Sequence, residues 1–270
     1  MATLRMLTLA DSRLEAYTEL TNHQLRSSWE HEHGMMIVES QIAIRVAIET
    51  GVKPISFLLD ERRLESMADL LEGIDDDVPV FVLPPEEAER LCGYRVTRGA
   101  LCAMERPQPR SVEQVSAGAR RLVVVEGVTD TSNIGAIFRN AAALGADGVV
   151  VAPTCADPLS RRAIRVSMGN VFRVRWCRAQ GAWPTDAFDA LRNSGFTCLA
   201  MALASDAMAL GDVARAQPGK VALCFGSEGA GLSNELLDAC DGKVVIPMAN
   251  GVDSLNVAAS SAVAMWELFR

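Results

Sequence analysis

The chain has 270 residues, of which 49% are hydrophobic and 22% are charged, and its formal net charge is −8. These values are typical of a soluble protein with one or two folded domains, and they exclude a disordered or low-complexity chain. No apolar run approaches the roughly 18 to 20 residues that a membrane-spanning helix needs. Residues 1–10 lack the basic and long apolar regions of a signal peptide, so we expect neither a membrane anchor nor secretion.

The seven cysteines are scattered and never adopt CxxC spacing. This pattern predicts neither a disulfide framework nor a zinc site. We interpret most of them as small buried hydrophobic residues in a reducing cytoplasm. His31 and His33 are only two residues apart, but we interpret them as surface histidines and expect no metal.

The first part of the chain, up to about residue 106, mixes helical and strand patterns after a short apolar run at residues 36–38. A helix is predicted at residues 40–50, because Ile44, Ala47 and Ile48 share one face and Gly51 follows as a stop signal. Strands are predicted at residues 54–59 and 78–82, and helices at residues 61–72 and 85–91. This order predicts a small α/β unit.

A linker is predicted next, because residues 106–111 hold two prolines and no apolar side chain. We therefore divide the chain into a domain at residues 1–108, a linker at residues 109–117 and a second domain at residues 118–270.

The second domain alternates strands and helices regularly. Its strands are predicted at residues 122–125, 148–152, 172–176, 196–201, 221–225 and 243–246. Its helices are predicted at residues 134–144, 159–166, 185–193, 233–240 and 255–269. Such alternation predicts a mostly parallel sheet covered on both faces.

Charge is distributed unevenly along the chain. Residues 1–110 have a net charge of −7 and residues 111–270 of −1. Between Asp157 and Asp186 there is no acidic residue, and this interval holds six arginines, namely Arg161, Arg162, Arg165, Arg173, Arg175 and Arg178. The interval is a candidate nucleic-acid contact if it lies beside a site, and otherwise it is solvated surface.

Three polar loops follow predicted strands, at the sheet edge where open α/β proteins bind ligands. In the first loop, at residues 126–145, Asn133 opens a helix, Gly135 allows close backbone approach and Arg139 follows one and a half turns on. Asn133 could equally be a helix cap only, and Arg139 a surface charge only.

The second loop, at residues 225–232, has three glycines directly after a strand. It lacks the Lys-Ser/Thr ending of a phosphate loop, and Glu228 would repel phosphate, so we exclude a nucleoside triphosphate site. The third loop, at residues 246–259, ends at the last helix. Asp253 or Ser254 could cap that helix, which leaves Asn256 unexplained.

In this order the three loops resemble the signature motifs of the SpoU/TrmH family of RNA 2′-O-ribose methyltransferases. Asn133, Gly135 and Arg139 match the first motif, Asn-x-Gly-x-x-x-Arg. Residues 226–231 match the second, Gly-Ser-Glu-Gly-x-Gly, and residues 246–248 with 254–257 match the third, Ile-Pro-Met followed by Ser-Leu-Asn-Val. Ala258 departs from the serine of many relatives. The resemblance covers residues 118–270.

The first domain resembles, more loosely, the L30e-like RNA-binding module that often precedes this catalytic domain. Its net charge of −7 departs from that resemblance.

The resemblance implies a trefoil-knotted, mostly parallel α/β domain of the SPOUT type, S-adenosylmethionine as cofactor and a homodimer. The implied catalytic residues are Asn133, Arg139, Glu228, Ser254 and Asn256. The implied cofactor-binding residues are Leu223, Gly226, Ile246, Met248, Leu255 and Asn256. The implied RNA-binding residues are Arg139, Arg161, Arg162 and Arg165.

The expected reaction is methylation of a ribose hydroxyl, which Arg139 would orient. Arginine is a poor base because its pKa lies above about 12. Ribosomal RNA is the expected substrate, and transfer RNA is the alternative. A non-catalytic RNA-binding factor and a small-molecule methyltransferase are competing hypotheses of other classes.

Overall fold

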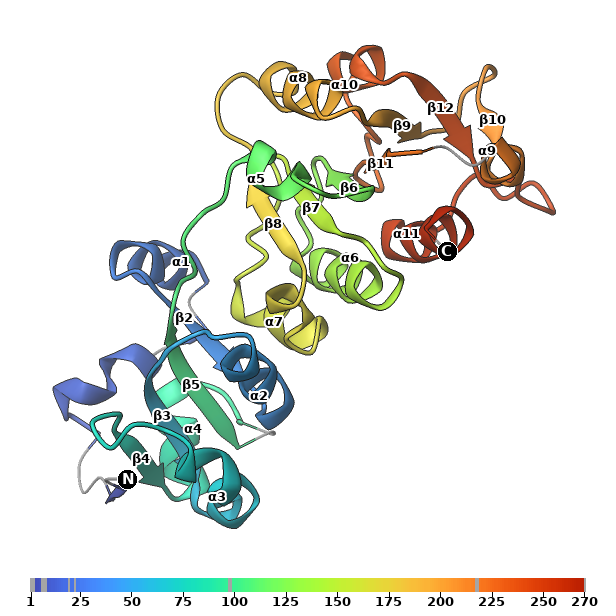
Figure 1. Cartoon of the computed structure of the whole chain (residues 1–270). Helices are drawn as coiled ribbons and strands as arrows, with labels where there is room; N and C mark the ends of the chain where they lie inside the picture. Colours follow the sequence, from blue (N-terminus) through green and yellow to red (C-terminus); the bar gives the residue numbers. More distant parts are fainter. Residues whose placement is uncertain are drawn as a thin grey trace. The chain divides into compact units, whose positions relative to one another are not determined.

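The computed structural model describes residues 3–5, 9–18, 20–21, 23–96, 99–216 and 219–269. The chain forms two compact units (Figure 1). Unit 1 consists of Met1–Pro107 and Leu159–Phe172, and unit 2 of Gln108–Pro158 and Arg173–Arg270. Unit 1 thus takes Leu159–Phe172, a segment that lies within the predicted second domain. Within the described ranges, no helix has the length and apolar character needed to cross a membrane.

Unit 1 is built on a mixed five-stranded sheet with the order β1-β4-β3-β5-β2. Its strands are β1 (Thr3–Arg5), β2 (Met35–Glu39), β3 (Pro54–Asp60), β4 (Val80–Leu83) and β5 (Ala100–Glu105). Strands β1, β3 and β4 are parallel, whereas β5 runs antiparallel to β2 and β3. Strand β5 was not predicted, because its sequence, ALCAME, has no β-branched residue. Burial between β2 and β3 makes it a strand.

The helices of unit 1 are η1 (Ser12–Tyr17), α1 (His23–Glu32), α2 (Gln41–Glu49), η2 (Glu61–Arg63), α3 (Leu64–Glu72) and α4 (Pro85–Cys92), with α7 (Arg161–Val166) and η3 (Asn170–Phe172) added by the later segment. Helices α2, α3, α4 and α7 lie where helices were predicted, whereas η1, α1 and η3 were not predicted. Helix α2 buries Ile44 and Ala47, as predicted, and the Ser40 side chain accepts a hydrogen bond from the Ala43 N–H at its start.

Unit 2 is built on a seven-stranded sheet with the order β10-β12-β9-β11-β6-β7-β8, and every strand pair is parallel. The strands are β6 (Arg121–Val125), β7 (Gly148–Val151), β8 (Arg175–Arg178), β9 (Thr197–Met201), β10 (Met208–Ala209), β11 (Val221–Phe225) and β12 (Gly242–Val245). The predicted parallel α/β architecture is confirmed. Strand β11 is buried along its whole length, as expected for a central strand covered on both faces.

Helices cover both faces of this sheet (Figure 1). They are α5 (Val112–Ser116), α6 (Thr131–Ala143), α8 (Thr185–Asn193), α9 (Leu210–Ala216), α10 (Asn234–Ala239) and α11 (Val257–Leu268). Helices α6 and α11 pack against each other. Helix α5 lies within the predicted linker, where Ser111 and Gln114 form a capping box and Val115 is buried. Strand β10 and helix α9 were also not predicted.

The parallel direction of β6, β11 and β12 determines where the site forms. These strands end at Val125, Phe225 and Val245. Because parallel strands present their carboxyl ends at one edge of a sheet, the three polar loops emerge at that same edge.

Candidate active site

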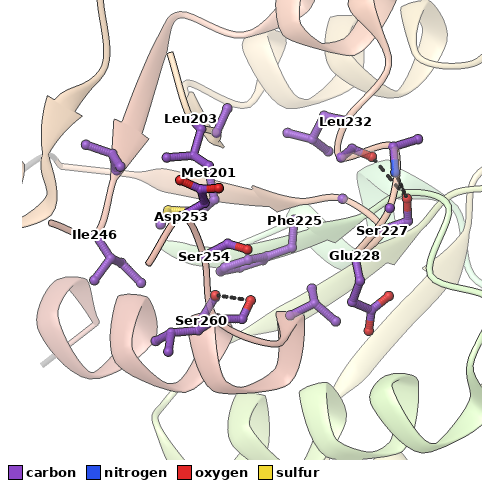
Figure 2. Close-up of a pocket in the computed structure, with 18 of the residues that line it drawn as sticks. Met201, Leu203, Phe225, Ser227, Glu228, Leu232, Ile246, Asp253, Ser254 and Ser260 are labelled. Carbon is purple, nitrogen blue, oxygen red and sulfur yellow. Dashed lines mark hydrogen bonds between the residues drawn. The ribbon is translucent and has the colours of Figure 1, made fainter. Parts of the chain in front are cut away.

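A cavity of about 360 Å³ lies in unit 2 at the carboxyl edge of its sheet (Figure 2). Its wall comes from the ends of β9, β11 and β12, from the loops that follow them, and from the start of α11. The volume falls within the range of about 300–1,000 Å³ that small-molecule sites occupy. The second and third polar loops therefore form one ligand-sized site.

The glycine-rich loop after β11 forms one wall and is closed on itself. The Ser227 N–H donates to the Gly231 carbonyl, and the Gly231 N–H donates back to the Ser227 carbonyl, both over 3.1 Å. A Cβ atom at Gly226 would lie 2.2 Å from the Gly231 carbonyl carbon and 2.4 Å from the Leu232 nitrogen. Glycine is required at residue 226 because two backbone segments cross there.

Four of the six predicted cofactor-binding residues line this cavity, namely Gly226, Ile246, Met248 and Leu255. Leu223 does not, because its side chain is fully buried within β11. Asn256 lies just beyond the lining, at the start of α11. Of the predicted catalytic residues, Glu228 and Ser254 contribute directly to the wall.

Hydrogen bonds join one polar residue from each of the three loops. The Asn256 Nδ2 donates to Asn133 Oδ1 over 3.1 Å, and the Asn133 Nδ2 donates to Glu228 Oε1. Asn256 Oδ1 in turn accepts from the Ala258 N–H over 2.9 Å. We call this series of hydrogen bonds, from the α11 N-terminus through Asn256 and Asn133 to Glu228, the amide relay.

The two ends of the amide relay determine how both side-chain amides are oriented. Backbone N–H groups only donate, so Asn256 must turn its oxygen toward the helix and its nitrogen toward Asn133. An ionised carboxylate only accepts, so Asn133 must turn its nitrogen toward Glu228. The relay therefore presents an N–H donor to Glu228 and fixes the position of its carboxylate.

Asn256 is also the N-cap of α11, since its oxygen accepts from the first backbone N–H groups of that helix. The expectation that Asp253 or Ser254 could be the cap is thus wrong. Both residues line the cavity instead. The Ser260 hydroxyl donates to the Leu255 carbonyl over 3.3 Å, which ties this segment to the helix (Figure 2).

Arg139 lies outside the cavity wall, exposed on α6. In the part of the chain that the structure describes, no hydrogen bond or ion pair engages its guanidinium. The neighbouring Asn140, by contrast, joins α6 to α11, because its Nδ2 donates to the Ala258 carbonyl over 2.8 Å and to Ser261 Oγ over 3.0 Å. One copy of unit 2 therefore does not bring Arg139 into the cavity.

Arg161 and Arg165 bind a carboxylate of unit 1. Glu39 has 1% of its side chain exposed and accepts from Arg161 over 2.9 Å and from Arg165 over 3.1 Å. The Arg161 guanidinium also lies 4.3 Å from the centre of the Tyr94 ring. These contacts hold α7 in unit 1 and engage two of the four predicted RNA-binding side chains. Arg162, on the same helix, is exposed.

Sequence reasoning missed Glu126, which is buried directly after β6. Its carboxylate accepts from the Trp183 Nε1 over 2.6 Å, from the Ser233 N–H over 2.7 Å and from the Ser233 hydroxyl over 2.9 Å. Glu126 thereby anchors the end of the glycine-rich loop, since Ser233 follows it and caps α10. The signal in the sequence was a carboxylate directly after four consecutive buried valine or leucine residues.

The cysteines take no part in the site. Burial raises the pKa of Cys177 and Cys198 to about 12, and it raises that of Cys224 as well. These thiols stay protonated and unreactive at neutral pH. Within the described ranges, no group of three or more histidine, cysteine or acidic residues could hold a metal ion.

Comparison with known proteins agrees with this geometry. Residues 120–266 match the model of the SpoU rRNA Methylase family. An uncharacterized tRNA/rRNA methyltransferase of Mycobacterium bovis is 38% identical over 261 residues, which cover 96% of this chain and 89% of that protein.

Two solved structures share the fold over nearly the whole chain. The AdoMet-bound rRNA methyltransferase from Sinorhizobium meliloti has a TM-score of 0.81 at 22% identity and covers 98% of this chain and 97% of that one. The SpoU methyltransferase AviRb from Streptomyces viridochromogenes, in complex with AdoMet, has a TM-score of 0.81 at 24% identity, with coverage of 96% and 98%. The family match, the 38% identity and the hydrogen bonds that join the three loops lead to one conclusion: the chain belongs to the SpoU family of RNA methyltransferases.

Proposed function

We propose that this protein transfers a methyl group from S-adenosylmethionine to a ribose 2′-hydroxyl of ribosomal RNA. The observation that carries the proposal is the amide relay, because it joins Asn133, Glu228 and Asn256 beside a ligand-sized cavity. A protein that had kept only the fold would have no need of this polar arrangement.

The cavity fits the proposed cofactor. Phe225, Leu232 and Leu255 offer apolar surface to an adenine ring, and the glycine-rich loop offers backbone groups to its polar edge. Two carboxylates on the wall suit a ligand that carries positive charge. When bound, S-adenosylmethionine supplies an activated methyl group on its sulfonium sulfur.

The protein's own residues would orient the ribose hydroxyl and stabilise it as it loses its proton. The hydrogen bond from Asn133 fixes the Glu228 carboxylate at the wall, and Ser254 offers a hydroxyl there. Arg139 would bind the ribose hydroxyl and stabilise the alkoxide that forms as its proton leaves. An arginine does so as a permanent cation, since its pKa lies above about 12.

Arg139 can take this role if the active protein is a homodimer whose second copy supplies it. The outer face of α11 exposes 41% of Val263 and 56% of Trp266, a large apolar surface for a helix end. We propose that a second copy covers this face, and that its own Arg139, exposed on the α6 helix that packs against α11, comes into reach. Assembly would then complete each cavity with an arginine of the other copy.

Unit 1 would recognise the RNA, and the chain segment that forms the cavity would be threaded as a trefoil knot. Both proposals follow from the family resemblance. Arg162 is exposed on α7 and is a candidate for an RNA contact, and Arg161 and Arg165 bind Glu39.

The test is transfer of radiolabelled methyl from S-adenosylmethionine to unmodified ribosomal RNA, ribosomal subunits and transfer RNA, each in a separate reaction. We expect label in ribosomal RNA, free or assembled, and 2′-O-methyl nucleosides after digestion. Arg139→Ala should abolish the label. Arg215→Ala is the matched control, because Arg215 is an exposed arginine of α9 that pairs with Asp212 and does not line the cavity. Label in transfer RNA alone would mean that transfer RNA, and not ribosomal RNA, is the substrate. Methylated bases would refute the ribose hydroxyl as the acceptor.

A further inference from the structure

The charged side chains on the cavity wall are both negative. Among the residues that line the cavity, Glu228 and Asp253 are acidic, and there is no lysine, arginine or histidine. Glu228 comes from the loop after β11, and Asp253 comes from the segment between β12 and α11 (Figure 2). A ligand in this cavity therefore meets negative charge from two separate elements.

The two carboxylates differ in what they bind. Glu228 accepts the hydrogen bond of Asn133 in the amide relay. Asp253 has no hydrogen-bond or ion-pair partner among the residues that the structure describes, and it does not cap α11, because Asn256 does. Asn250 and Gly251, with φ of +58° and +70°, make the turn that brings Asp253 to the wall. Asp253 is thus the carboxylate that can meet a ligand's charge.

We propose that Asp253 is a specificity residue that reads the positive charge on the cofactor's sulfur and so favours S-adenosylmethionine over the product S-adenosylhomocysteine. The inference rests on the proposed function, since it assumes that this cofactor occupies the cavity. In the overall reaction S-adenosylmethionine and a ribose hydroxyl give S-adenosylhomocysteine, a methyl ether and a proton. The sulfonium cation is thereby replaced by a neutral thioether, and the charge that attracted the cofactor is lost.

The consequence for turnover is selective release of the product. Both molecules carry the same adenosine and the same amino-acid group, so apolar packing and backbone contacts bind them alike. The sulfur charge is the difference that a carboxylate can detect. A partly exposed ion pair at this wall corresponds to a preference of about tenfold, because solvent screens the attraction.

The experiment is calorimetric titration of the full chain with three ligands: S-adenosylmethionine, S-adenosylhomocysteine and sinefungin, in which a protonated amine replaces the sulfonium. The test variant is Asp253→Asn, which keeps the shape and removes the charge. The control is Asp189→Asn, on α8 and outside the cavity, where the aspartate pairs with Arg192. Thermal unfolding of each variant checks that the fold is retained.

We expect the wild-type protein and the control to bind the two cationic ligands about tenfold more tightly than S-adenosylhomocysteine. Asp253→Asn should weaken the cationic ligands by about that factor and leave S-adenosylhomocysteine within about twofold. Raising the salt concentration should lower the preference of the wild-type protein but not that of the variant, because salt screens an exposed charge pair.

An equal loss for all three ligands would overturn the inference, because it would mean that Asp253 binds the ammonium group that they share. An unchanged preference in Asp253→Asn would overturn it as well, while leaving the proposed function intact. If the wild-type protein bound none of the three ligands, the proposed function would fail together with the inference.

Discussion

Replacing Asn256 separates its two roles, because its oxygen caps α11 and its nitrogen begins the amide relay. Asn256→Asp keeps an oxygen for the helix N–H groups but removes the donor to Asn133. Asn133 must then either face a second acceptor or turn its own nitrogen away from Glu228. In both cases Glu228 loses a well-placed donor, whereas the helix keeps its cap.

The substitutions Asn256→Ala and Asn256→Asp should affect stability and activity to different extents. Asn256→Ala should lower the free energy of unfolding by about 1–2 kcal/mol, through loss of the cap and of one hydrogen bond. Asn256→Asp should leave it within about 0.5 kcal/mol of wild type, because a carboxylate is favourable at a helix N-terminus. Its kcat/KM should still fall about 10- to 100-fold, which corresponds to losing a hydrogen bond to a charged group worth about 1.5–3 kcal/mol.

Urea unfolding and methyl-transfer kinetics on the same preparations provide the measurement. Full activity in Asn256→Asp would refute the idea that the amide relay serves catalysis. Wild-type stability in Asn256→Ala would refute the capping role. A parallel loss of stability and activity in both variants would mean that Asn256 acts through folding alone.

Three further changes test other parts of the site and fold. Gly226→Ala should abolish cofactor binding, because the added Cβ would lie 2.2 Å from the Gly231 carbonyl carbon. Calorimetric titration measures this, and binding within about twofold of wild type would contradict the close crossing of the two backbone segments. Glu126→Gln should destabilise unit 2 by about 1–3 kcal/mol, since one amide oxygen cannot serve three donors, and should change Trp183 fluorescence; an unchanged unfolding midpoint would count against the anchor. Asp60 has a pKa lowered first by its side-chain hydrogen bond to Arg62, so its stabilisation is present above the usual aspartate pKa and lost as the pH falls through the lowered value. The stability difference between wild type and Asp60→Asn should therefore shrink on acidification from about pH 6 to pH 3, and a constant difference would argue against the pairing.

Local patterns in the sequence were sufficient to predict the parallel sheet of unit 2 and the loops that form its cavity. Continuous apolar runs such as β11 identify strands covered on both faces, and parallel strands bring their following loops to one edge. The position of Glu228 at the site follows from that rule alone. Strands and helices with weak local patterns, such as β5, β10 and α9, could not be predicted in this way, because neighbouring elements stabilise them.

Only the tertiary structure decided which polar groups meet. Asn256 is hydrogen-bonded to Asn133, which lies 123 positions earlier in the chain, and Arg161 is hydrogen-bonded to Glu39, which lies 122 positions earlier. Periodicity reports which face of an element is buried, but it carries no information on the partner of a single polar side chain. Burial of Glu39 demands compensating cations, and the folded chain supplies them from α7. Two of the arginines that suggested an RNA contact in the sequence, Arg161 and Arg165, therefore bind a buried carboxylate within unit 1.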